Sequence, residues 1–240
     1  MGAVDLGEDV HLWYVFSDEV REAGILERFA VLMAPEERAR HDRFVFEKDR
    51  HQFLVTRGVI RTLIGRYLDV DPAECAFVAN EYGRPSLSHP AGGTLAFNIS
   101  HTNGMVVCAL AREPEIGVDV EDASRAIGLE LARRFFSADE ADALEALPED
   151  ERPARFFEYW TLKEAYIKAR GMGLSLPLDG FSMQLPAGGP PGIRFATTID
   201  DAAGTWQFAQ FRPTPRHHLA VAVRRRGGDR AIRLRELRVE

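Results

Sequence analysis

The sequence predicts an α+β fold in which one chain forms two similar α/β lobes, a pseudo-dimer, each a small, mainly antiparallel sheet packed with helices. Apolar periodicity and turn residues give the order strand, helix, strands in the first half and strand, helices, strands in the second. A polar stretch with a proline, residues 112–115, separates the halves. We therefore expect lobes at 1–113 and 114–225, followed by a tail at 226–240 without an assigned role.

The first half begins with a strand and a long helix. Residues 10–16 alternate well enough to predict a strand. Residues 34–66 have helical periodicity with an interruption expected near Phe46, and Pro35 with the acidic residues after it favours the helix start. Two further strands are expected at 94–99 and 105–111, joined by a tight connection at 100–104.

The second half begins with a short strand, GVDVE, at residues 117–121. Ser137 and Glu140 have the spacing of a capping box, which marks a helix start. Helices are expected at 129–135, 138–147 and 154–170. Strands are expected at 181–185, 193–198, 205–211 and 219–223, with the turn AGGPPG, 187–192, joining the first two.

The composition of the chain excludes several classes of protein. Its 240 residues, 45% of them hydrophobic and 28% charged, are typical of a globular protein. A net charge of -7 argues against a general nucleic-acid binder, which needs a basic surface. Two scattered cysteines favour neither a disulfide framework nor a thiolate zinc site, so any metal should be oxygen-bound. Without a signal peptide or a membrane-length apolar run, the protein is expected to be cytoplasmic.

The stretch RFFEYWTLKEAYIKARGMGLSL, residues 155–176, contains the most informative helix. On a helical wheel, Glu164 falls within an otherwise apolar arc of about 100°. The apolar members of this arc are Phe156, Phe157, Trp160 and Ile167. A carboxylate that points toward a core must be neutralised by a cation, a metal or a strong donor. Lys168, one turn further on, is a candidate, and a surface Glu–Lys pair is the alternative.

The strand GVDVE places two carboxylates on one face. Because side chains alternate along a strand, Asp119 and Glu121 project together while the intervening valines point to a core. Gly117 is expected to leave the face before them open. With Glu164, three carboxylates can converge, which is a ligand set that Mg²⁺ favours, with phosphate oxygens and water as its other ligands. The alternative is the exposed face of an edge strand.

Two turn sequences carry further polar side chains. FNISHTNG places Asn98, Ser100 and His101 at the end of a strand, where they are suited to holding phosphate oxygens. A serine hydrolase is disfavoured, because neighbours in an extended chain point opposite ways and no G-x-S-x-G elbow is present. The alternative is a polar hairpin that satisfies its own backbone. NEYGRP is common turn chemistry, although Arg84 is a plausible phosphate contact.

Four motifs together resemble one family. NEYGRP, FNISHT, GVDVE and WTLKEAYIKARGMGLSLPLDGFS, in this order and spacing, are similar to the Sfp-type 4′-phosphopantetheinyl transferases with the Trp and Lys-Glu-Ala form of the last motif. The likeness covers about residues 35–181. It implies transfer of the phosphopantetheine arm of coenzyme A to a serine of an apo acyl, peptidyl or aryl carrier protein, with release of adenosine 3′,5′-bisphosphate. Such enzymes are associated with secondary metabolite biosynthesis.

The resemblance also implies roles for individual residues. The first lobe is expected to hold the nucleotide and 3′-phosphate of coenzyme A, and the second the metal, Mg²⁺ or Mn²⁺, and the carrier protein. One departure is Glu37, where relatives such as the Bacillus enzyme carry Lys. The metal ligands correspond to Asp119, Glu121 and Glu164, the coenzyme A contacts to Arg84, Ser100, His101 and Lys168, and the 3′-phosphate contacts to Arg40 and Arg57. The catalytic residues expected are Glu164 as general base, with Lys168 and His101 as donors to phosphate oxygens, and Trp160 anchors the motif helix.

The partner surface and two rival functions stay open at this level. Met172 and Leu174 either dock the carrier protein or pack beneath their own turn. Two similar halves can build within one chain a cleft that a smaller relative builds between subunits, so a monomer with its active site between the lobes is expected. The rivals are a non-catalytic coenzyme A sensor and a metal-dependent pyrophosphate hydrolase, which would share much of the same site.

Overall fold

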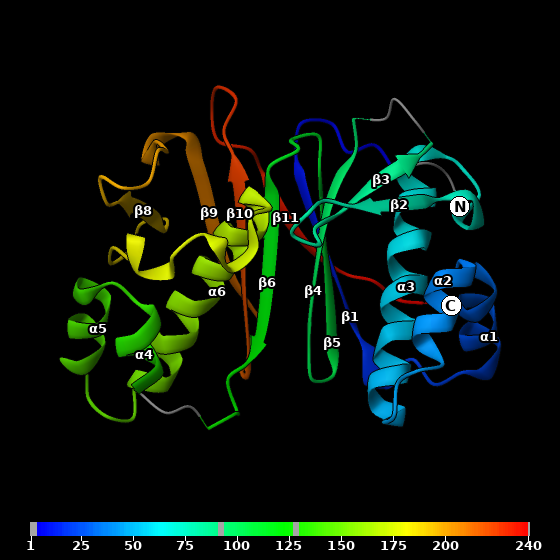
Figure 1. Ribbon diagram of the computed structural model, residues 1–240, viewed down its shortest axis with the longest axis horizontal. Helices are drawn as coiled ribbons and strands as arrows, with labels where there is room; N and C mark the ends of the chain where they lie inside the picture. Colours follow the sequence, from blue (N-terminus) through cyan, green and yellow to red (C-terminus); the bar gives the residue numbers. More distant parts are fainter. Residues whose placement is uncertain (1–3, 91–93, 127–129, 240) are drawn as a thin grey trace. The chain divides into compact units, whose positions relative to one another are not determined.

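The chain folds into two compact units in a computed structural model that describes residues 4–90, 94–126 and 130–239 (Figure 1). Each unit is described by itself. The first unit comprises Met1–Asn80, Pro85–Pro114 and Ala231–Glu240, and the second comprises Glu81–Arg84 and Glu115–Arg230.

The first unit is built on a sheet with the strand order β11-β1-β5-β4. The three strands β1, β5 and β4 pair antiparallel, whereas β11 pairs parallel with β1. The tail to which the sequence assigned no role thus supplies an edge strand of this sheet. The strands are β11 (Ile232–Glu236), β1 (Val10–Phe16), β5 (Met105–Ala111) and β4 (Ala96–Thr102), with a separate hairpin of β2 (Ala76–Ala79) and β3 (Pro85–His89).

Helices cover this sheet in the first unit. The interruption predicted near Phe46 is confirmed, since α2 (Pro35–His41) ends before it and α3 (Glu47–Leu68) begins after it. The helix α1 (Ala23–Leu32) was not predicted, because it begins without a side-chain cap and without an acidic first turn. Short 3₁₀ turns lie at Ser17–Glu19 and Pro72–Glu74.

The connection between β4 and β5 is shorter than predicted. Strand β4 continues through Thr102, which pairs with Met105, so the prediction that Ser100 and His101 lie in the connection is wrong. Gly104 adopts a φ of 78°, which suits glycine in a tight turn. As strand residues, Ser100 and His101 lie on opposite faces, the first buried and the second exposed, as expected for neighbours in an extended chain.

The second unit is built on a sheet with the order β6-β10-β9, which is antiparallel throughout. The capping box at Ser137 is confirmed, and the AGGPPG turn joins two antiparallel strands as predicted. The start predicted for the first helix, Leu129, lies outside the described residues. The strands are β6 (Ile116–Asp122), β10 (His217–Arg224), β9 (Trp206–Thr214), β7 (Phe181–Gln184) and β8 (Gly192–Phe195); the helices are α4 (Glu130–Phe135), α5 (Ala138–Glu145) and α6 (Arg152–Arg170), with 3₁₀ turns at Gly173–Ser175, Leu178–Gly180 and Ala203–Thr205.

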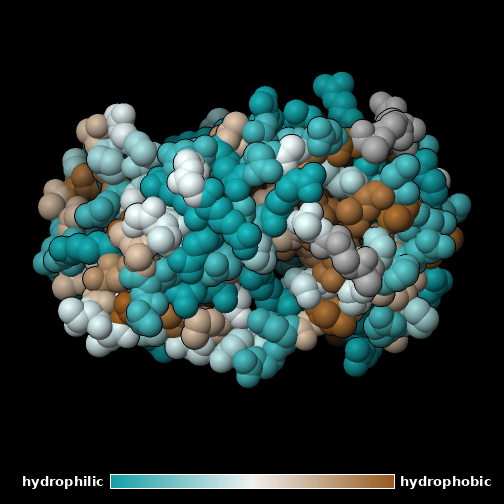
Figure 2. Space-filling model, turned by 90° about the horizontal axis from the view of Figure 1, so that it is seen from above, coloured by the Kyte–Doolittle hydropathy of each residue, from teal (hydrophilic) through white to brown (hydrophobic). Residues whose placement is uncertain are grey.

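The prediction of small, mainly antiparallel sheets packed with helices in two lobes is confirmed. In each unit one long helix, α3 or α6, contributes many of the buried apolar side chains. Hydrophilic side chains predominate on the face shown in Figure 2, and hydrophobic ones form separate patches. Within the described residues, no helix combines the length and the apolar composition that crossing a bilayer requires.

Candidate functional site

Helix α6 covers the face of β6 that carries the two carboxylates. A Cβ atom added at Gly117 would lie 2.1 Å from Ala165 O and 2.4 Å from Ala169 N. The prediction that Gly117 leaves this face open is therefore wrong: the missing side chain lets the helix backbone approach the strand. This close approach brings Asp119 and Glu121, which share the face of Gly117, beside α6.

Asp119 is buried against this helix. Its side chain is 6% exposed, and its Oδ1 atom accepts a hydrogen bond from Lys168 Nζ at 2.7 Å. The exposed-edge alternative therefore does not describe Asp119, although β6 is an edge strand. The predicted neutraliser of Glu164 instead forms its ion pair with Asp119, while its charge also lowers the pKa of Glu164. Asp119 and Lys168 thus join β6 to α6 through a charged hydrogen bond.

The other two carboxylates have raised pKa values. Burial raises the pKa of Glu121, the charge of Asp119 raises it further, and Arg125, Lys168 and the Trp160 indole oppose the shift. Arg125 Nη2 donates to Glu121 Oε2 at 2.9 Å. Burial raises the pKa of Glu164 to about 7, with Asp119 and Glu121 adding to the effect. Burial is the larger cause of both shifts, and the negative charge of Asp119 adds to each of them.

These carboxylates fit a hard divalent cation by their chemistry. Among residues 4–90, 94–126 and 130–239, no group of three or more His, Cys, Asp or Glu side chains is arranged as a set of metal ligands. The fit rests on charge: Asp119, Glu121 and Glu164 are close enough to perturb one another, and all are oxygen donors. A cation among them would relieve the repulsion that raises the pKa of Glu164. Metal binding by these residues stays a prediction.

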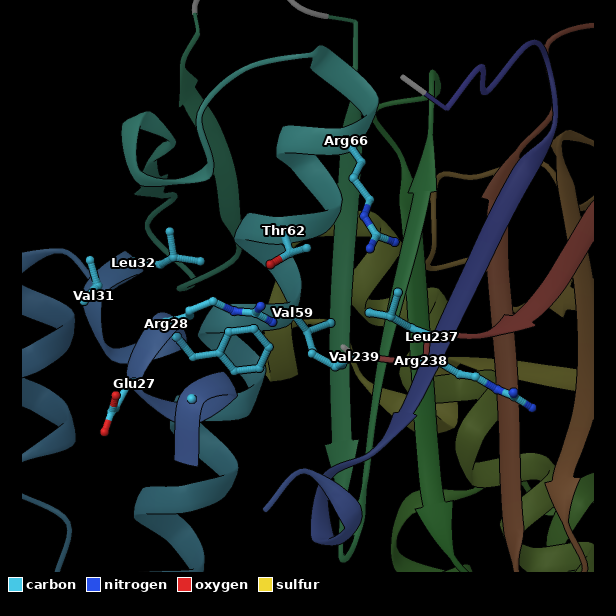
Figure 3. Close-up of a pocket in the computed structure, with 12 residues that line it drawn as sticks. Glu27, Arg28, Val31, Leu32, Val59, Thr62, Arg66, Leu237, Arg238 and Val239 are labelled. Atoms are coloured by element: carbon cyan, nitrogen blue, oxygen red, sulfur yellow. The ribbon is translucent and has the colours of Figure 1, made fainter. Parts of the chain in front are cut away.

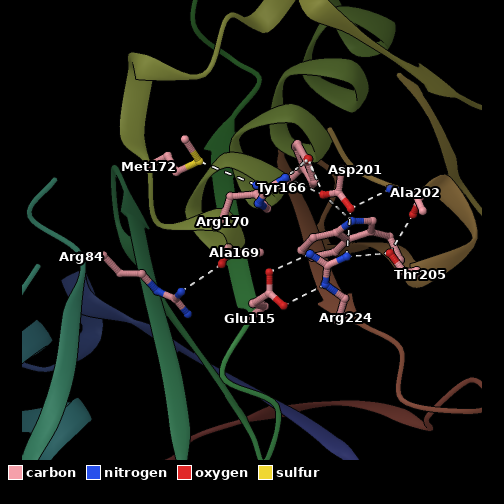
Figure 4. Close-up of polar contacts among 11 residues, drawn as sticks. Arg84, Glu115, Tyr166, Ala169, Arg170, Met172, Asp201, Ala202, Thr205 and Arg224 are labelled. Atoms are coloured by element: carbon pink, nitrogen blue, oxygen red, sulfur yellow. Dashed lines mark hydrogen bonds and ion pairs between the residues drawn. The ribbon is translucent and has the colours of Figure 1, made fainter. Parts of the chain in front are cut away.

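Arg84 holds together the two elements that carry the carboxylates. Its Nη1 donates to Ala169 O at 2.9 Å and its Nη2 donates to Ile116 O at 3.0 Å. Figure 4 shows this side chain directed at the end of α6. The NEYGRP turn therefore contributes a structural clamp between α6 and β6, and the coenzyme A contact predicted for Arg84 remains a prediction.

Asp201 fixes the C-terminal end of α6 (Figure 4). Its carboxylate accepts hydrogen bonds from Tyr166 at 2.8 Å and from Trp206 at 3.0 Å. It also pairs with Arg170 at 2.5 Å and with Arg224 at 2.9 Å. This role was not predicted, because Asp201 lies in a polar loop with no periodic pattern that would indicate a buried carboxylate.

Lys163, the lysine of the Lys-Glu-Ala triplet, is a buried structural residue that the sequence argument missed. Its side chain is 0% exposed and pairs with Glu140 at 2.7 Å. Its Nζ also donates to Leu178 O at 2.8 Å and Phe181 O at 2.6 Å. A signal was available, since Lys163 follows Phe156 by two helical turns and therefore shares its buried face.

In the first unit, a cavity of about 350 Å³ gathers three of the predicted coenzyme A residues, Arg40, Arg57 and His101. The guanidinium groups of Arg40 and Arg57 lie 5.4 and 5.1 Å from the centre of the Phe53 ring, which also lines the cavity. Ser100, only 6% exposed, does not line it. The cavity combines positive charge with an aromatic face, which suits a nucleotide phosphate.

Glu37, the departure from the family pattern, has a structural role. Its carboxylate pairs with Arg61 at 2.8 Å, and Arg57 lies 3.5 Å away. The same carboxylate accepts a hydrogen bond from Ala34 N at 3.0 Å and so caps α2. Arg57 therefore shares its charge between Glu37 and the cavity, which leaves Arg40 as the cation less committed to Glu37.

Sequence comparison covers both units. A profile described as the 4′-phosphopantetheinyl transferase superfamily matches residues 115–223. A second profile, described as the N-terminal part of a 4′-phosphopantetheinyl transferase, matches residues 23–113. The two matches together span the elements that carry the carboxylates and those that form the basic cavity.

Curated relatives match over most of their length. The 4′-phosphopantetheinyl transferase Sfp of Bacillus subtilis (strain 168) is 36% identical over 82% of this chain and 84% of its own. The 4′-phosphopantetheinyl transferase HetI of Nostoc sp. is 34% identical over 91% of this chain and 89% of its own. A phosphopantetheinyl transferase of Thraustochytrium sp. is 32% identical over 81% of this chain and 71% of its own.

Proposed function

The chain belongs to the 4′-phosphopantetheinyl transferase superfamily, and from this membership we propose that it transfers the 4′-phosphopantetheine group of coenzyme A to a serine of an apo carrier protein. The serine Oγ–P bond forms, the P–O bond of the coenzyme A pyrophosphate breaks, and adenosine 3′,5′-bisphosphate leaves with the bridging oxygen. The serine proton passes to a base on the enzyme.

Within the structure, the proposal is supported by the carboxylates of Asp119 and Glu121 on β6 and of Glu164 on α6, whose charges act on one another. Asp119, Glu121 and Glu164 would hold Mg²⁺ or Mn²⁺ through oxygen atoms. The bound ion would supply positive charge that stabilises the pyrophosphate as it is cleaved. Lys168 Nζ lies 2.7 Å from Asp119 Oδ1. A lysine ammonium that can contact an anionic substrate therefore lies beside the carboxylates that would hold the cation.

The chain's own side chains account for proton transfer and phosphate binding. Glu164 is the proposed acceptor of the serine proton; burial raises its pKa to about 7 when no cation is bound, and a bound cation would lower that pKa. The side chain of Lys168 is partly exposed, and its Nζ can donate a hydrogen bond to a phosphate oxygen. Arg40, Arg57 and His101 line the basic cavity, and we propose that this cavity holds the 3′-phosphate of coenzyme A. The active site expected between the lobes remains a prediction.

The carrier surface and the assembly state belong to the same proposal. Met172, which is partly exposed and contacts Arg170 through its sulfur at 3.8 Å, is the proposed docking residue. The side chain of Leu174 lies outside the described part of the structure. We also propose that the protein is cytoplasmic and that it is a monomer. Light scattering of the purified chain would measure its mass in solution and so test the monomer.

A mass measurement tests the proposal. Apo acyl and peptidyl carrier proteins are incubated with coenzyme A, Mg²⁺ and the enzyme, and the carrier mass is expected to rise by one phosphopantetheine group. Replacing the acceptor serine of the carrier by Ala is the matched control and should abolish the gain. Coenzyme A binding without any mass gain across both carriers would support a sensor, and coenzyme A cleavage without a carrier would support a hydrolase.

A further inference from the structure

A second cavity, larger than the basic one, lies entirely within the first unit. It has a volume of about 560 Å³ and is formed by α1, α3 and residues 237–239, which follow β11 (Figure 3). This volume falls within the ~300–1,000 Å³ of small-molecule sites. Arg40, Arg57 and His101 do not line it, so it is separate from the proposed nucleotide cavity.

The interior of this cavity is apolar and continuous with the core. Phe29, Val59 and Leu237 line it and are 3%, 2% and 4% exposed, so its floor is a set of well-packed core side chains. Val31 lines it too but is 72% exposed, which places an open rim beside a closed floor. A cavity with this gradient accommodates an apolar body inserted from solvent.

Positive charge stands beside the apolar floor. Arg28 and Arg66 extend toward the space between α1, α3 and the C-terminal residues, whereas Glu27 and Arg238 point away from it (Figure 3). Thr62 adds a hydroxyl to the same wall. Two guanidinium groups beside a low-polarity cavity favour an anionic group on the ligand.

We propose that this cavity binds an amphipathic anion with a single alkyl chain, a medium-chain or long-chain carboxylate or alkyl phosphate. The alkyl chain of the ligand lies on Phe29, Val59 and Leu237, and its head group is held by Arg28 and Arg66. A small molecule is favoured over a helical peptide, because three segments enclose the cavity and its volume is that of a ligand site. Its occupant would join the C-terminal segment to α1 and α3.

Titration calorimetry with dodecanoate, below its micelle concentration, tests the proposal on the full chain. One saturable site per chain is expected, with binding at least about tenfold weaker for 1-dodecanol and for dodecyltrimethylammonium, since a charged hydrogen bond to the head is lost. Dodecyl phosphate is titrated in parallel, and the tighter anion identifies the head group. Equal affinity for the neutral alcohol and the anion would overturn the proposal.

Variants separate head recognition from chain burial. The double variant Arg28→Glu with Arg66→Glu should weaken dodecanoate at least about tenfold. Arg134→Glu, an exposed arginine of α4 in the second unit, makes the same kind of charge reversal elsewhere and should bind as the wild type. Thr62→Phe should weaken dodecanoate by filling the cavity. Far-ultraviolet circular dichroism checks folding, and unchanged dodecanoate affinity in the folded double variant would contradict the proposed head site.

Phosphopantetheine transfer by the same variants keeps this inference distinct from the proposed function. Arg28 and Arg66 have no part in the proposed transfer site, so carrier modification should proceed at the wild-type rate in their double variant. Loss of dodecanoate binding with intact transfer supports the cavity proposal, and if the wild type shows no transfer at all, the dodecanoate titrations still test the cavity proposal by themselves. Intact dodecanoate binding in the double variant together with lost transfer would contradict the cavity proposal.

Discussion

The two lysines of α6, Lys163 and Lys168, differ in their burial and in the carboxylates around them. Lys163 is 0% exposed and pairs with Glu140, whose side chain is 2% exposed. Lys168 is 28% exposed and pairs with Asp119, whose side chain is 6% exposed. The first lysine has one carboxylate partner and two carbonyl acceptors, whereas the second faces a carboxylate cluster that includes Glu164.

The difference between them lies in how completely the charge is balanced. Lys163 and Glu140 are both buried, and Glu140 has further partners inside the fold. It accepts a hydrogen bond from Met183 N at 2.6 Å and caps α5 at Ser137. Lys168 pairs with Asp119 at 2.7 Å and also acts on Glu164, whose pKa is raised to about 7 by burial and by the charges of Asp119 and Glu121. A balanced buried pair rigidifies a fold, while an unbalanced and partly exposed one can bind a charged ligand.

Replacing the buried lysine should have the largest effect. Lys163→Met leaves the Glu140 carboxylate buried without its cation, which should lower the free energy of unfolding by about 3–5 kcal/mol. Urea denaturation measures this loss. Lys48→Met, at an exposed lysine, is the control and should change stability by less than about 0.5 kcal/mol. A loss below about 1 kcal/mol in Lys163→Met would show that the pair does not hold α6 in place.

Replacing the carboxylate of the cluster should act on the reaction. Glu164→Gln should lower the rate of carrier modification by about 10²–10⁴-fold, because it removes the proposed base and a proposed metal ligand. Mass spectrometry of the carrier measures the rate, and denaturation should show an intact fold. Near-normal turnover at saturating Mg²⁺ would remove Glu164 from the mechanism.

The close approach of β6 to α6 can be tested by one added carbon. Gly117→Ala places a Cβ 2.1 Å from Ala165 O, so the helix must shift, and about 1–3 kcal/mol of stability should be lost. Gly204→Ala, where nothing lies within 4 Å of the added carbon, is the matched control. Equal stabilities for the two variants would mean that the strand and helix are not packed so closely.

The pH dependence of the free energy of unfolding should reveal the raised pKa of Glu164. In the unfolded chain Glu164 ionises near 4.5, and in the fold its pKa is about 7, so the folded state holds more protons between these values and loses stability as pH rises. Without divalent cations, Glu164→Gln should therefore gain about 1–3 kcal/mol relative to wild type between pH 5 and 8. A difference that does not change with pH would contradict the raised pKa.

The sequence predicted the parts of the fold that leave a local signal. The alternation in β1, the break before α3 and the capping box of α5 all depend on neighbouring residues, and all are confirmed. Strand β11 could not be predicted in the same way, because its exposed arginines hide a pairing with β1 that begins far earlier in the chain. Likewise α1 lacks a cap and an acidic first turn.

For the candidate site, the sequence predicted the convergence of the three carboxylates but not the side chains that pair with them. Periodicity predicted that Asp119, Glu121 and Glu164 can converge, and the raised pKa values of Glu121 and Glu164, to which burial and then the charge of Asp119 contribute, agree with that arrangement. The choice of Asp119 as the ion-pair partner of Lys168 depends on a distance across two elements, which spacing along one helix does not contain. The close contact of the α6 backbone with Gly117 likewise depends on how strand and helix pack, which the local sequence does not show.

The most direct measurement compares Lys163→Met and Lys168→Met by the rate of carrier modification per folded molecule. Lys168→Met should lower the rate of carrier modification by about 10²–10³-fold with an unchanged fold, because the proposed donor to the phosphate is removed. Lys163→Met should lose stability but retain most of its rate per folded molecule at low temperature. A normal rate in Lys168→Met, or an equal loss of rate per folded molecule in both variants, would contradict the division between the two lysines.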